Sequence, residues 1–226
     1  MVDKTRSARA SLDAQRDHWE RTYRELPDKF GHDPSEAGRR AERVFAEHGS
    51  RDILELGCGG GRDALYFASH AYEVDALDYA SSAIGELQSR ARFAALDARL
   101  RAHVHDARTT LPFHANRFDA VFGHMFHNMA LDDDELDAIF DETYRVLRPR
   151  GLLVFSARNT SDPDANEGFA LAPFLRDVDG DVIRFFSAAC LASFVRRYEP
   201  METIELCEGS LPKRLSLAVV RKPAHP

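Results

Sequence analysis

The 226-residue sequence has few cysteines and no long apolar run. Its three cysteines, Cys58, Cys190 and Cys207, are an odd number without paired spacing, which argues against a disulfide scaffold or a zinc ribbon. No segment approaches the roughly 18 consecutive apolar residues that cross a bilayer. Residues 1–6 are polar and lack the apolar stretch of a signal peptide. We therefore expect a cytoplasmic protein with reduced thiols and no membrane partner.

An excess of basic residues is also lacking, because the formal net charge is -7. Proteins that bind a nucleic-acid backbone usually present a basic face. The local basic clusters, such as Arg145, Arg148 and Arg150, stand among acids and at expected helix ends. The charge therefore argues against nucleic acid as the partner, and the length favours one domain with a substantial core.

The first 48 residues have the pattern of two helices. Trp19, Tyr23 and Leu26 fall at helical spacing. Pro34-Ser35-Glu36 then opens a second helix, which closes at Gly49.

From residue 50 onward, strand-like and helix-like segments alternate. Strands are predicted at 52–56, 73–77, 102–105, 118–123 and 151–157, and helices at 62–70, 81–96 and 132–147. Strands that alternate with helices indicate an α/β protein with a parallel sheet covered on both faces.

The C-terminal part is less regular. Residues 158–186 contain Asp, Asn, Pro and Gly throughout and are predicted to form a long irregular loop. A helix at 187–198 and two antiparallel strands at 201–207 and 215–221 are expected to complete the sheet.

The most informative feature is a cluster of four glycines within five positions, from Gly57 to Gly61, at a predicted strand-to-helix turn. Each glycine loses more backbone entropy on folding than any other residue. Such a cluster is useful where the backbone must pass close to a ligand.

The residues that end the next strands support a nucleotide-like ligand, because ligands of open α/β sheets bind beyond the carboxyl ends of the strands. Asp78 ends the second strand, about 20 residues after Gly57, the spacing of a carboxylate that accepts ribose hydroxyls. Asp106 ends the third strand and His124 follows the fourth.

A nicotinamide dinucleotide is the rival ligand. Gly59-x-Gly61-x-x-Ala64 with Asp78 downstream is an acceptable dinucleotide fingerprint. Glu55, however, suits a ligand with a cationic amine, and Asp106 suits an adenine amino group. A pyrophosphate requires neither, although an NAD(P)-dependent oxidoreductase stays the alternative.

Residues 50–157 resemble the class I S-adenosylmethionine-dependent methyltransferases. The motifs that carry the resemblance are Glu55-x-Gly57-x-Gly59-x-Gly61, Asp78, Asp106, the segment 117–121 and the segment 145–153, in the order and spacing of that family. The resemblance implies a Rossmann-like fold in a single domain over residues 1–226. Its sheet would have seven mostly parallel strands, the last of them antiparallel.

The resemblance also implies roles in binding S-adenosylmethionine. The motif glycines would let the chain pass the methionine end of the cofactor, and Asp78 would hold the ribose hydroxyls. Asp106, together with the backbone amide of Ala107, would read the adenine, and His124 would lie near the methionine amino group.

The flanking segments are similar to a small-molecule branch that includes the thiopurine and tellurite-resistance methyltransferases. In that branch the N-terminal helices, here residues 1–49, cover the cofactor, so Trp19 and Tyr23 are expected to contact it. The Rossmann-like core would span 50–226, and its segment 158–186 would form the substrate wall.

The candidate catalytic residues are His124 and His127, which directly follow the fourth strand. Methyl transfer from a sulfonium mainly requires orientation and exclusion of water, but an oxygen or nitrogen nucleophile of high pKa also needs a base. Histidine can accept a proton near neutral pH. The alternative is that one or both histidines only line the pocket or cap the loop.

The sequence gives weaker support for a functional role of the other polar residues. Arg158 and Arg184 could hold an anionic group of the substrate or form ordinary ion pairs. His103 and His105 alternate along one strand beside Asp106, but no other segment offers a ligand, so no metal is expected.

The sequence thus predicts an S-adenosylmethionine-dependent methyltransferase that acts on oxygen, nitrogen or sulfur of a small molecule. The alternatives are the oxidoreductase and a non-catalytic protein that binds S-adenosylmethionine.

Overall fold

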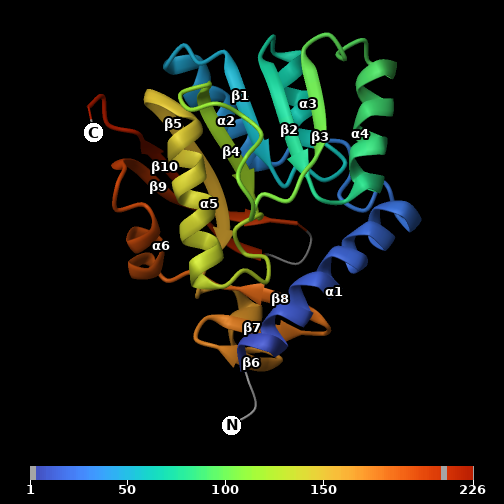
Figure 1. The fold of residues 1–226 in the computed structure, drawn as a ribbon, viewed down its shortest axis with the longest axis vertical. Coiled ribbons are helices and arrows are strands. Elements are labelled where there is room, and N and C mark those ends of the chain that lie inside the picture. Colours follow the sequence, from blue (N-terminus) through green and yellow to red (C-terminus); the bar gives the residue numbers. More distant parts are fainter. Residues whose placement is uncertain (1–3, 210–212, 226) are drawn as a thin grey trace.

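The computed structural model describes residues 4–209 and 213–225, and a seven-stranded sheet forms its centre (Figure 1). The strands follow the order β3-β2-β1-β4-β5-β10-β9. The first five in chain order pair in parallel, whereas β10 is antiparallel to both β5 and β9. This arrangement confirms the predicted fold. The bounds are β1 (Asp52–Leu56), β2 (Glu73–Asp78), β3 (Leu100–Val104), β4 (Phe118–His124), β5 (Leu147–Arg158), β9 (Glu199–Glu208) and β10 (Lys213–Arg221).

Helices cover both faces of the sheet (Figure 1). One face packs against α2 (Glu36–Glu47), α3 (Arg62–Ser69) and α4 (Ser81–Phe93), and the other against α5 (Asp133–Val146) and α6 (Ala188–Phe194). Successive residues of β1 alternate between these two cores: Ile53 belongs to the first and Leu54 to the second. Parallel strands buried on both faces explain the nearly continuous apolar runs in the sequence.

Two of the helix starts follow the local sequence signals. Asp132 accepts a hydrogen bond from the amide of Glu135 at 2.8 Å, and the Glu135 carboxylate accepts one from the amide of Asp132 at 2.9 Å. These two hydrogen bonds form a capping box at the start of α5. At α2 the hydroxyl of Ser35 accepts a hydrogen bond from the amide of Gly38.

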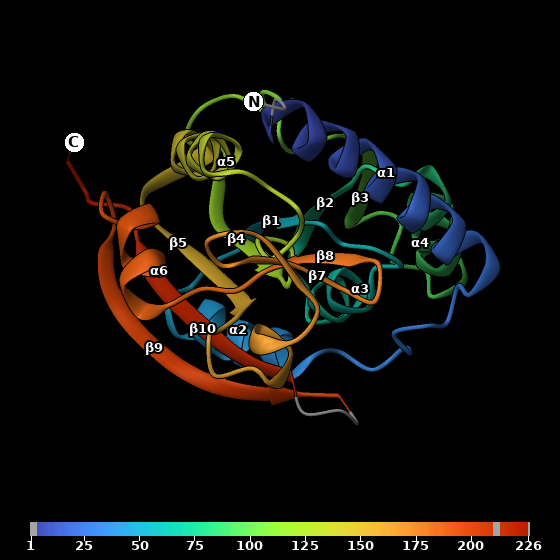
Figure 2. The same cartoon turned by 90° about the horizontal axis from the view of Figure 1, so that it is seen from below.

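Helix α1 (Lys4–Glu25) lies beyond the carboxyl ends of the parallel strands and reaches toward α4 (Figure 2). Near its C-terminal end, Glu20 accepts hydrogen bonds from Ser81 and Ser82 at the start of α4. Farther back along α1, the Gln15 amide donates to the backbone oxygen of Val182 at 2.8 Å. The helix is thus joined to two separate parts of the fold. No helix in the described ranges is long and apolar enough to cross a membrane.

The prediction of a long irregular loop at 158–186 is wrong. After the short 3-10 helix η1 (Pro163–Asn166), this segment forms an antiparallel sheet of β6 (Phe169–Ala172), β7 (Leu175–Val178) and β8 (Asp181–Arg184). Its strands have only four residues each and no residue of β6 or β7 is buried, so within this segment only β8 shows a period-two pattern of burial. The hairpin turn at Asp179-Gly180, with φ of +54° and +91°, is the one strong local signal.

Four strand starts also differ from the prediction. β9 and β10 each begin two residues early, at Glu199 and Lys213. β3 begins at Leu100 instead of residue 102, and β5 begins at Leu147 instead of residue 151. The start of β5 is irregular, because its register with β4 shifts between Phe118 and Ala120 and because Arg150 has a φ of +66°. Pro149 therefore stands inside a distorted strand end and not in a separate loop.

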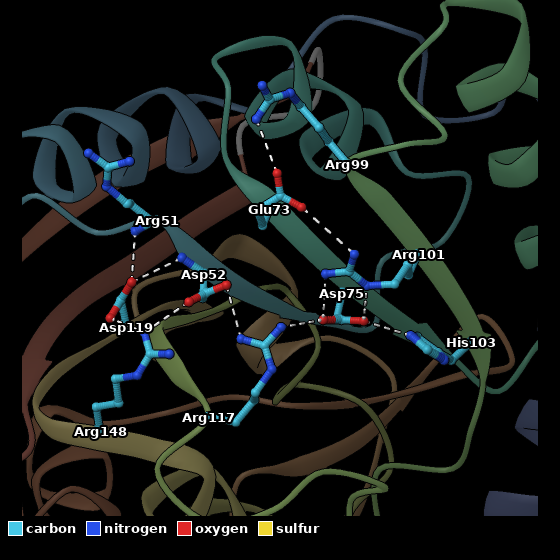
Figure 3. A network of polar contacts seen from close by, with 10 residues as sticks. All are labelled: Arg51, Asp52, Glu73, Asp75, Arg99, Arg101, His103, Arg117, Asp119 and Arg148. Atoms are coloured by element: carbon cyan, nitrogen blue, oxygen red, sulfur yellow. Dashed lines mark hydrogen bonds and ion pairs between the residues drawn. The ribbon is translucent and has the colours of Figure 1, made fainter.

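A network of ion pairs and hydrogen bonds joins five neighbouring strands, β3, β2, β1, β4 and β5, toward their amino-terminal ends (Figure 3). Asp75 of β2 is contacted by the imidazole of His103 at 2.9 Å and by the guanidinium of Arg101 at 3.2 Å. Asp52 of β1 pairs with Arg117 at 3.0 Å and Arg148 at 2.9 Å. His103 thus makes a side-chain contact with Asp75 on the neighbouring strand β2.

Candidate active site

A pocket opens at the carboxyl ends of β1, β2 and β4, beneath α1 and the segment that follows it. Nine of the eleven predicted site residues line it, whereas Asp106 and His127 do not. The predicted residues in its wall are Trp19, Tyr23, Glu55, Gly57, Gly59, Gly61, Asp78, Ala107 and His124.

The glycine loop passes its neighbours too closely for any side chain. Gly57, Gly59 and Gly61 have φ of +66°, +51° and +78°, in the left-handed region. A Cβ on Gly57 would lie 2.7 Å from Cδ2 of Phe126, one on Gly59 would overlap the hydroxyl of Tyr23, and one on Gly61 would overlap Leu87. These three glycines let the loop lie against the neighbouring side chains, and we call residues 57–61 the glycine cradle because all of them line the pocket.

Asp78 is fixed at the end of β2 beside this cradle. One carboxylate oxygen accepts a hydrogen bond from the amide of Gly59 and the other from the amide of Ala80, both at 2.9 Å. Burial raises the pKa of Asp78, and the two amide hydrogen bonds partly oppose that shift. Each oxygen keeps a second lone pair, so the carboxylate can accept two hydroxyl donors of a ligand.

Glu55 is a buried acid with an unused acceptor in the same pocket. It is 3% exposed, and its Oε2 has no hydrogen-bond partner within the described ranges. Burial and the neighbouring carboxylate of Asp63 raise its pKa well above the ordinary value. An unsatisfied buried carboxyl oxygen is costly unless a ligand supplies a donor. The cradle, the fixed acceptors of Asp78 and this oxygen together fit S-adenosylmethionine, which offers vicinal hydroxyls and an ammonium group.

Asp63, which the sequence reasoning passed over, links this pocket to the N-terminal part of the chain. Its carboxylate accepts a hydrogen bond from the amide of Ser35 at 2.7 Å and one from the hydroxyl of Ser35 at 2.9 Å. Since Ser35 also caps α2, a single serine connects the start of α2 to the start of α3.

An aromatic cluster covers the pocket from the side of α1. The rings of Trp19, Tyr23 and Phe30 pack with centroids about 6 Å apart. Burial and the charge of Asp78 raise the pKa of Tyr23 well above its ordinary value, so its hydroxyl stays protonated. The Lys29 ammonium lies 5.5 Å from the Trp19 ring centroid and 5.6 Å from that of Phe30.

The two candidate histidines lie in different surroundings. His124 ends β4 in the pocket wall, and its Nδ1 is 2.8 Å from the hydroxyl of Ser156 on β5. Its Nε2 has no hydrogen-bond partner among the residues described, and Oε1 of Glu208 is 3.7 Å away. Burial, with the charges of Arg62 and Lys213, lowers the pKa of His124 to about 3.

His127 is fully buried in the core instead of the pocket. Its ring stacks on Phe140 at a centroid distance of 4.9 Å and packs against Phe155 at 4.8 Å. Both ring nitrogens are without a partner in the described part of the chain, and burial lowers the pKa of His127 to about 3.

Asp106 is engaged by a neighbour and lies outside the pocket lining. Arg108 forms a two-pronged ion pair with it, at 2.6 Å and 2.9 Å. Although burial alone would raise the pKa of Asp106, these hydrogen bonds lower it. Ala107, the next residue, lines the pocket, and its role in reading adenine stays a prediction.

The two arginines considered for an anionic substrate are occupied by other groups. Arg158 is buried and pairs with Asp162 and Asp164. Arg184 pairs with Asp133 at 2.8 Å and donates to the backbone oxygen of Leu131. Neither arginine lines the pocket.

Several lining residues carried no signal that sequence reasoning used. Phe126 and Asn128 stand within the segment around the two histidines, so proximity to the fourth strand would have pointed to them. Lys213 has no local motif, because antiparallel pairing alone brings the start of β10 to this edge of the sheet. The remaining unpredicted members of the wall include Phe30, Arg62, Tyr79, Arg90, Met125 and Met129.

Residues 53–151 match the family model described as a methyltransferase domain. The tRNA N(3)-methylcytidine methyltransferase Mettl2 of Drosophila melanogaster is 33% identical over 112 residues, which cover 46% of this chain and 34% of that protein. The malonyl-[acyl-carrier protein] O-methyltransferase of Enterobacter lignolyticus is 31% identical over 105 residues, 46% of this chain and 38% of that protein. The chain thus spans only about a third of the length of these two curated relatives.

Solved structures share the fold over more of the chain. The 1,6-didemethyltoxoflavin-N1-methyltransferase of Burkholderia thailandensis superposes with a TM-score of 0.75 at 20% identity, covering 99% of this chain and 92% of that one. TehB of Haemophilus influenzae superposes with a TM-score of 0.65 at 15% identity, covering 89% and 65%. At such identities these likenesses establish the fold.

Proposed function

We propose that this chain, whose residues 53–151 match a methyltransferase domain, is a class I S-adenosylmethionine-dependent methyltransferase that transfers a methyl group to a small-molecule acceptor. The observation that carries the proposal is the meeting of three features in one pocket: the glycine cradle, the fixed carboxylate of Asp78 and the unpartnered oxygen of Glu55. When bound, the cofactor supplies the methyl group already activated on a sulfonium.

The chain's own residues would bind the cofactor and orient its methyl group toward the acceptor. Asp78 would accept the ribose hydroxyls, Glu55 would face the methionine ammonium, and the Ala107 amide would contact the adenine. The rings of Trp19 and Tyr23 would exclude water from the reacting centre, which favours an in-line displacement by a nucleophile held in place.

His124 is the proposed proton acceptor when the nucleophile is oxygen or nitrogen. Its lowered pKa keeps the ring neutral, and the Ser156 hydroxyl fixes the orientation of the ring. The acceptor's proton would then pass to the unpartnered Nε2. His127 is walled off by phenylalanine rings, so we assign the role to His124 alone.

Three observations support a small acceptor. The pocket lies under α1 and its aromatic cluster, and its wall includes Phe30 and Phe126, which suit a planar apolar ring. The net charge of -7 disfavours a nucleic acid. The Burkholderia enzyme with the same fold was solved with 1,6-didemethyltoxoflavin bound, although the Drosophila relative is a tRNA methyltransferase.

Calorimetric titration with S-adenosylhomocysteine and with NAD tests the cofactor, and transfer of labelled methyl from S-adenosylmethionine to a panel of small molecules and to tRNA tests the acceptor. Binding of S-adenosylhomocysteine with transfer to a small molecule is the expected result. Preference for NAD would favour an oxidoreductase. Cofactor binding without any transfer would favour a binding protein, and transfer to tRNA alone would overturn the small-molecule assignment.

A further inference from the structure

Lys213 brings a positive charge into the pocket without a direct ion pair to any described residue. It begins β10 and lines the pocket, and its ammonium has no hydrogen bond or ion pair with any described residue. Burial and the charges of Arg158 and Lys29 lower its pKa, although the nearby carboxylates of Asp162 and Asp164 partly oppose that shift. A half-buried ammonium without a partner is unfavourable for folding. A ligand that carries negative charge would remove that cost.

Strand order places Lys213 on the acceptor side of the pocket. Asp78, the proposed ribose ligand, ends β2, and three strands (β1, β4 and β5) separate β2 from β10. Lys213 is close enough to His124 for its charge to contribute to the lowered pKa of that ring. The lysine therefore lies beside the proposed proton acceptor and away from the nucleoside end.

Two other cations at this end, Arg62 and Arg158, already have partners. Arg62 pairs with Glu208 at 2.9 Å and donates to the backbone oxygen of Phe30 at 3.2 Å. Arg158 pairs with Asp162 and Asp164. Of these three cationic side chains, Lys213 alone has its charge available to a bound molecule.

We propose that the acceptor is an aromatic or heteroaromatic carboxylate and that Lys213 is the specificity-determining residue that binds its anionic group. The inference rests on the proposed methyl transfer and narrows its substrate class. The ammonium would donate a charge-assisted hydrogen bond to the carboxylate, while Phe30 and Phe126 pack against the ring.

Such an acceptor would also act on His124. When the carboxylate neutralises Lys213, one of the two positive charges that disfavour protonation of His124 is removed. His124 then becomes a stronger proton acceptor in the complex than in the empty pocket. A neutral analogue of the same shape would bind without increasing the basicity of His124.

Paired ligands test the proposal. The protein saturated with S-adenosylhomocysteine is titrated calorimetrically with carboxylates of benzene, pyridine, indole and naphthalene, each beside its neutral carboxamide. We expect at least one carboxylate to bind ten or more times tighter than its amide. Lys213→Met, which keeps the length of the side chain, should abolish that ratio, and Lys213→Arg should keep most of it.

Arg214→Met is the matched control. It removes the same charge one position along β10, where the side chain points to the other face and does not line the pocket. It should leave the carboxylate-to-amide ratio unchanged. Near-equal affinities within every pair, or no binding of any carboxylate, would overturn the proposal.

Titration with S-adenosylhomocysteine distinguishes a failure of the proposed methyltransferase function from a failure of the proposed role of Lys213. If wild-type protein fails to bind S-adenosylhomocysteine, the proposed function itself fails. If Lys213→Met lowers the affinity for S-adenosylhomocysteine tenfold, Lys213 instead binds the cofactor's own carboxylate. That result would overturn the acceptor assignment. Unchanged cofactor affinity together with a lost carboxylate preference is the supporting result.

Discussion

Asp78 accepts a hydrogen bond from the backbone amide of Gly59 at 2.9 Å, and this contact joins the end of β2 to the glycine loop after β1. The proposed acceptor of the ribose hydroxyls and the proposed cradle of the methionine therefore form one unit. A change at either residue is expected to disturb the position of the other. The first two predictions follow from this pairing.

Asp78→Ala should weaken binding of S-adenosylhomocysteine by more than tenfold. The substitution removes both acceptors offered to the ribose and leaves the buried amide of Gly59 without its partner. Isothermal calorimetry measures the change. Asp97→Ala, at an exposed position, is the control and should bind like the wild type. Equal affinities of the two variants would rule out the assignment of Asp78.

Gly59→Ala and Gly60→Ala should differ although they are adjacent. At Gly59 a methyl group would overlap the Tyr23 hydroxyl on a backbone with φ of +51°, whereas at Gly60 the nearest of the surrounding atoms is 3.7 Å away. The left-handed conformation alone costs roughly 1–2 kcal/mol. Urea unfolding should show a loss of at least about that size for Gly59→Ala and a clearly smaller one for Gly60→Ala. Similar losses would contradict a close approach at Gly59.

His124→Ala should lower turnover by about a hundredfold or more, the usual contribution of a positioned acid or base, with little change in cofactor affinity. Because the pKa of His124 is lowered to about 3, the ring of the free enzyme is neutral between pH 5 and 8. The profile of kcat/KM should therefore show no titration of this residue in that range. A bend near pH 6.5 that disappears in His124→Ala would contradict the buried, neutral ring.

His127→Leu should stabilise the protein and leave cofactor binding intact. The substitution replaces two buried ring nitrogens without partners in the described residues by an apolar side chain between Phe140 and Phe155. Removing such unsatisfied groups is worth on the order of 1 kcal/mol. Urea unfolding measures the gain. A well-folded variant with lost turnover would return His127 to the list of candidate bases.

Asp75→Asn should reduce the dependence of stability on acid pH. Burial alone would raise the pKa of Asp75, but the hydrogen bonds from His103 and Arg101 lower it. A lowered carboxyl pKa stabilises the fold fully above the unfolded value of about 3.9, and this contribution is lost as pH falls through the folded value. Unfolding free energies of the wild type should therefore drop between pH 5 and pH 3 more steeply than those of the variant. Parallel slopes would contradict the shift, and Asp134→Asn, an exposed carboxylate, is the control.

The sequence revealed those parts of the fold that depend on neighbouring residues. The capping box of Asp132 and Glu135 lies within four residues, and the alternation of Ile53 with Leu54 and Leu56 reflects a strand buried on both faces. Such signals need no tertiary contact to be recognised. The glycine loop was likewise visible, because its backbone conformation excludes almost every other residue.

Features created by distant contacts could not be foreseen in the same way. The strands β6 to β8 are four residues long and gain their structure from pairing with one another, although Asp179-Gly180 marked one hairpin. Arg158 looked available for an anion until the fold placed Asp162 and Asp164 around it. Lys213 reaches the pocket only because β10 runs antiparallel beside β5.

The ion-pair network (Figure 3) lies toward the amino-terminal ends of the parallel strands, whereas the pocket lies at their carboxyl ends. This separation divides the molecule into a part that can be varied and a part that should be conserved during protein engineering. A library of variants restricted to Phe30, Phe126 and Lys213 would alter which acceptors are methylated. It would leave the ion pairs between the strands unchanged. New substrate preferences could then be selected over many rounds while the scaffold keeps its tolerance of further substitutions.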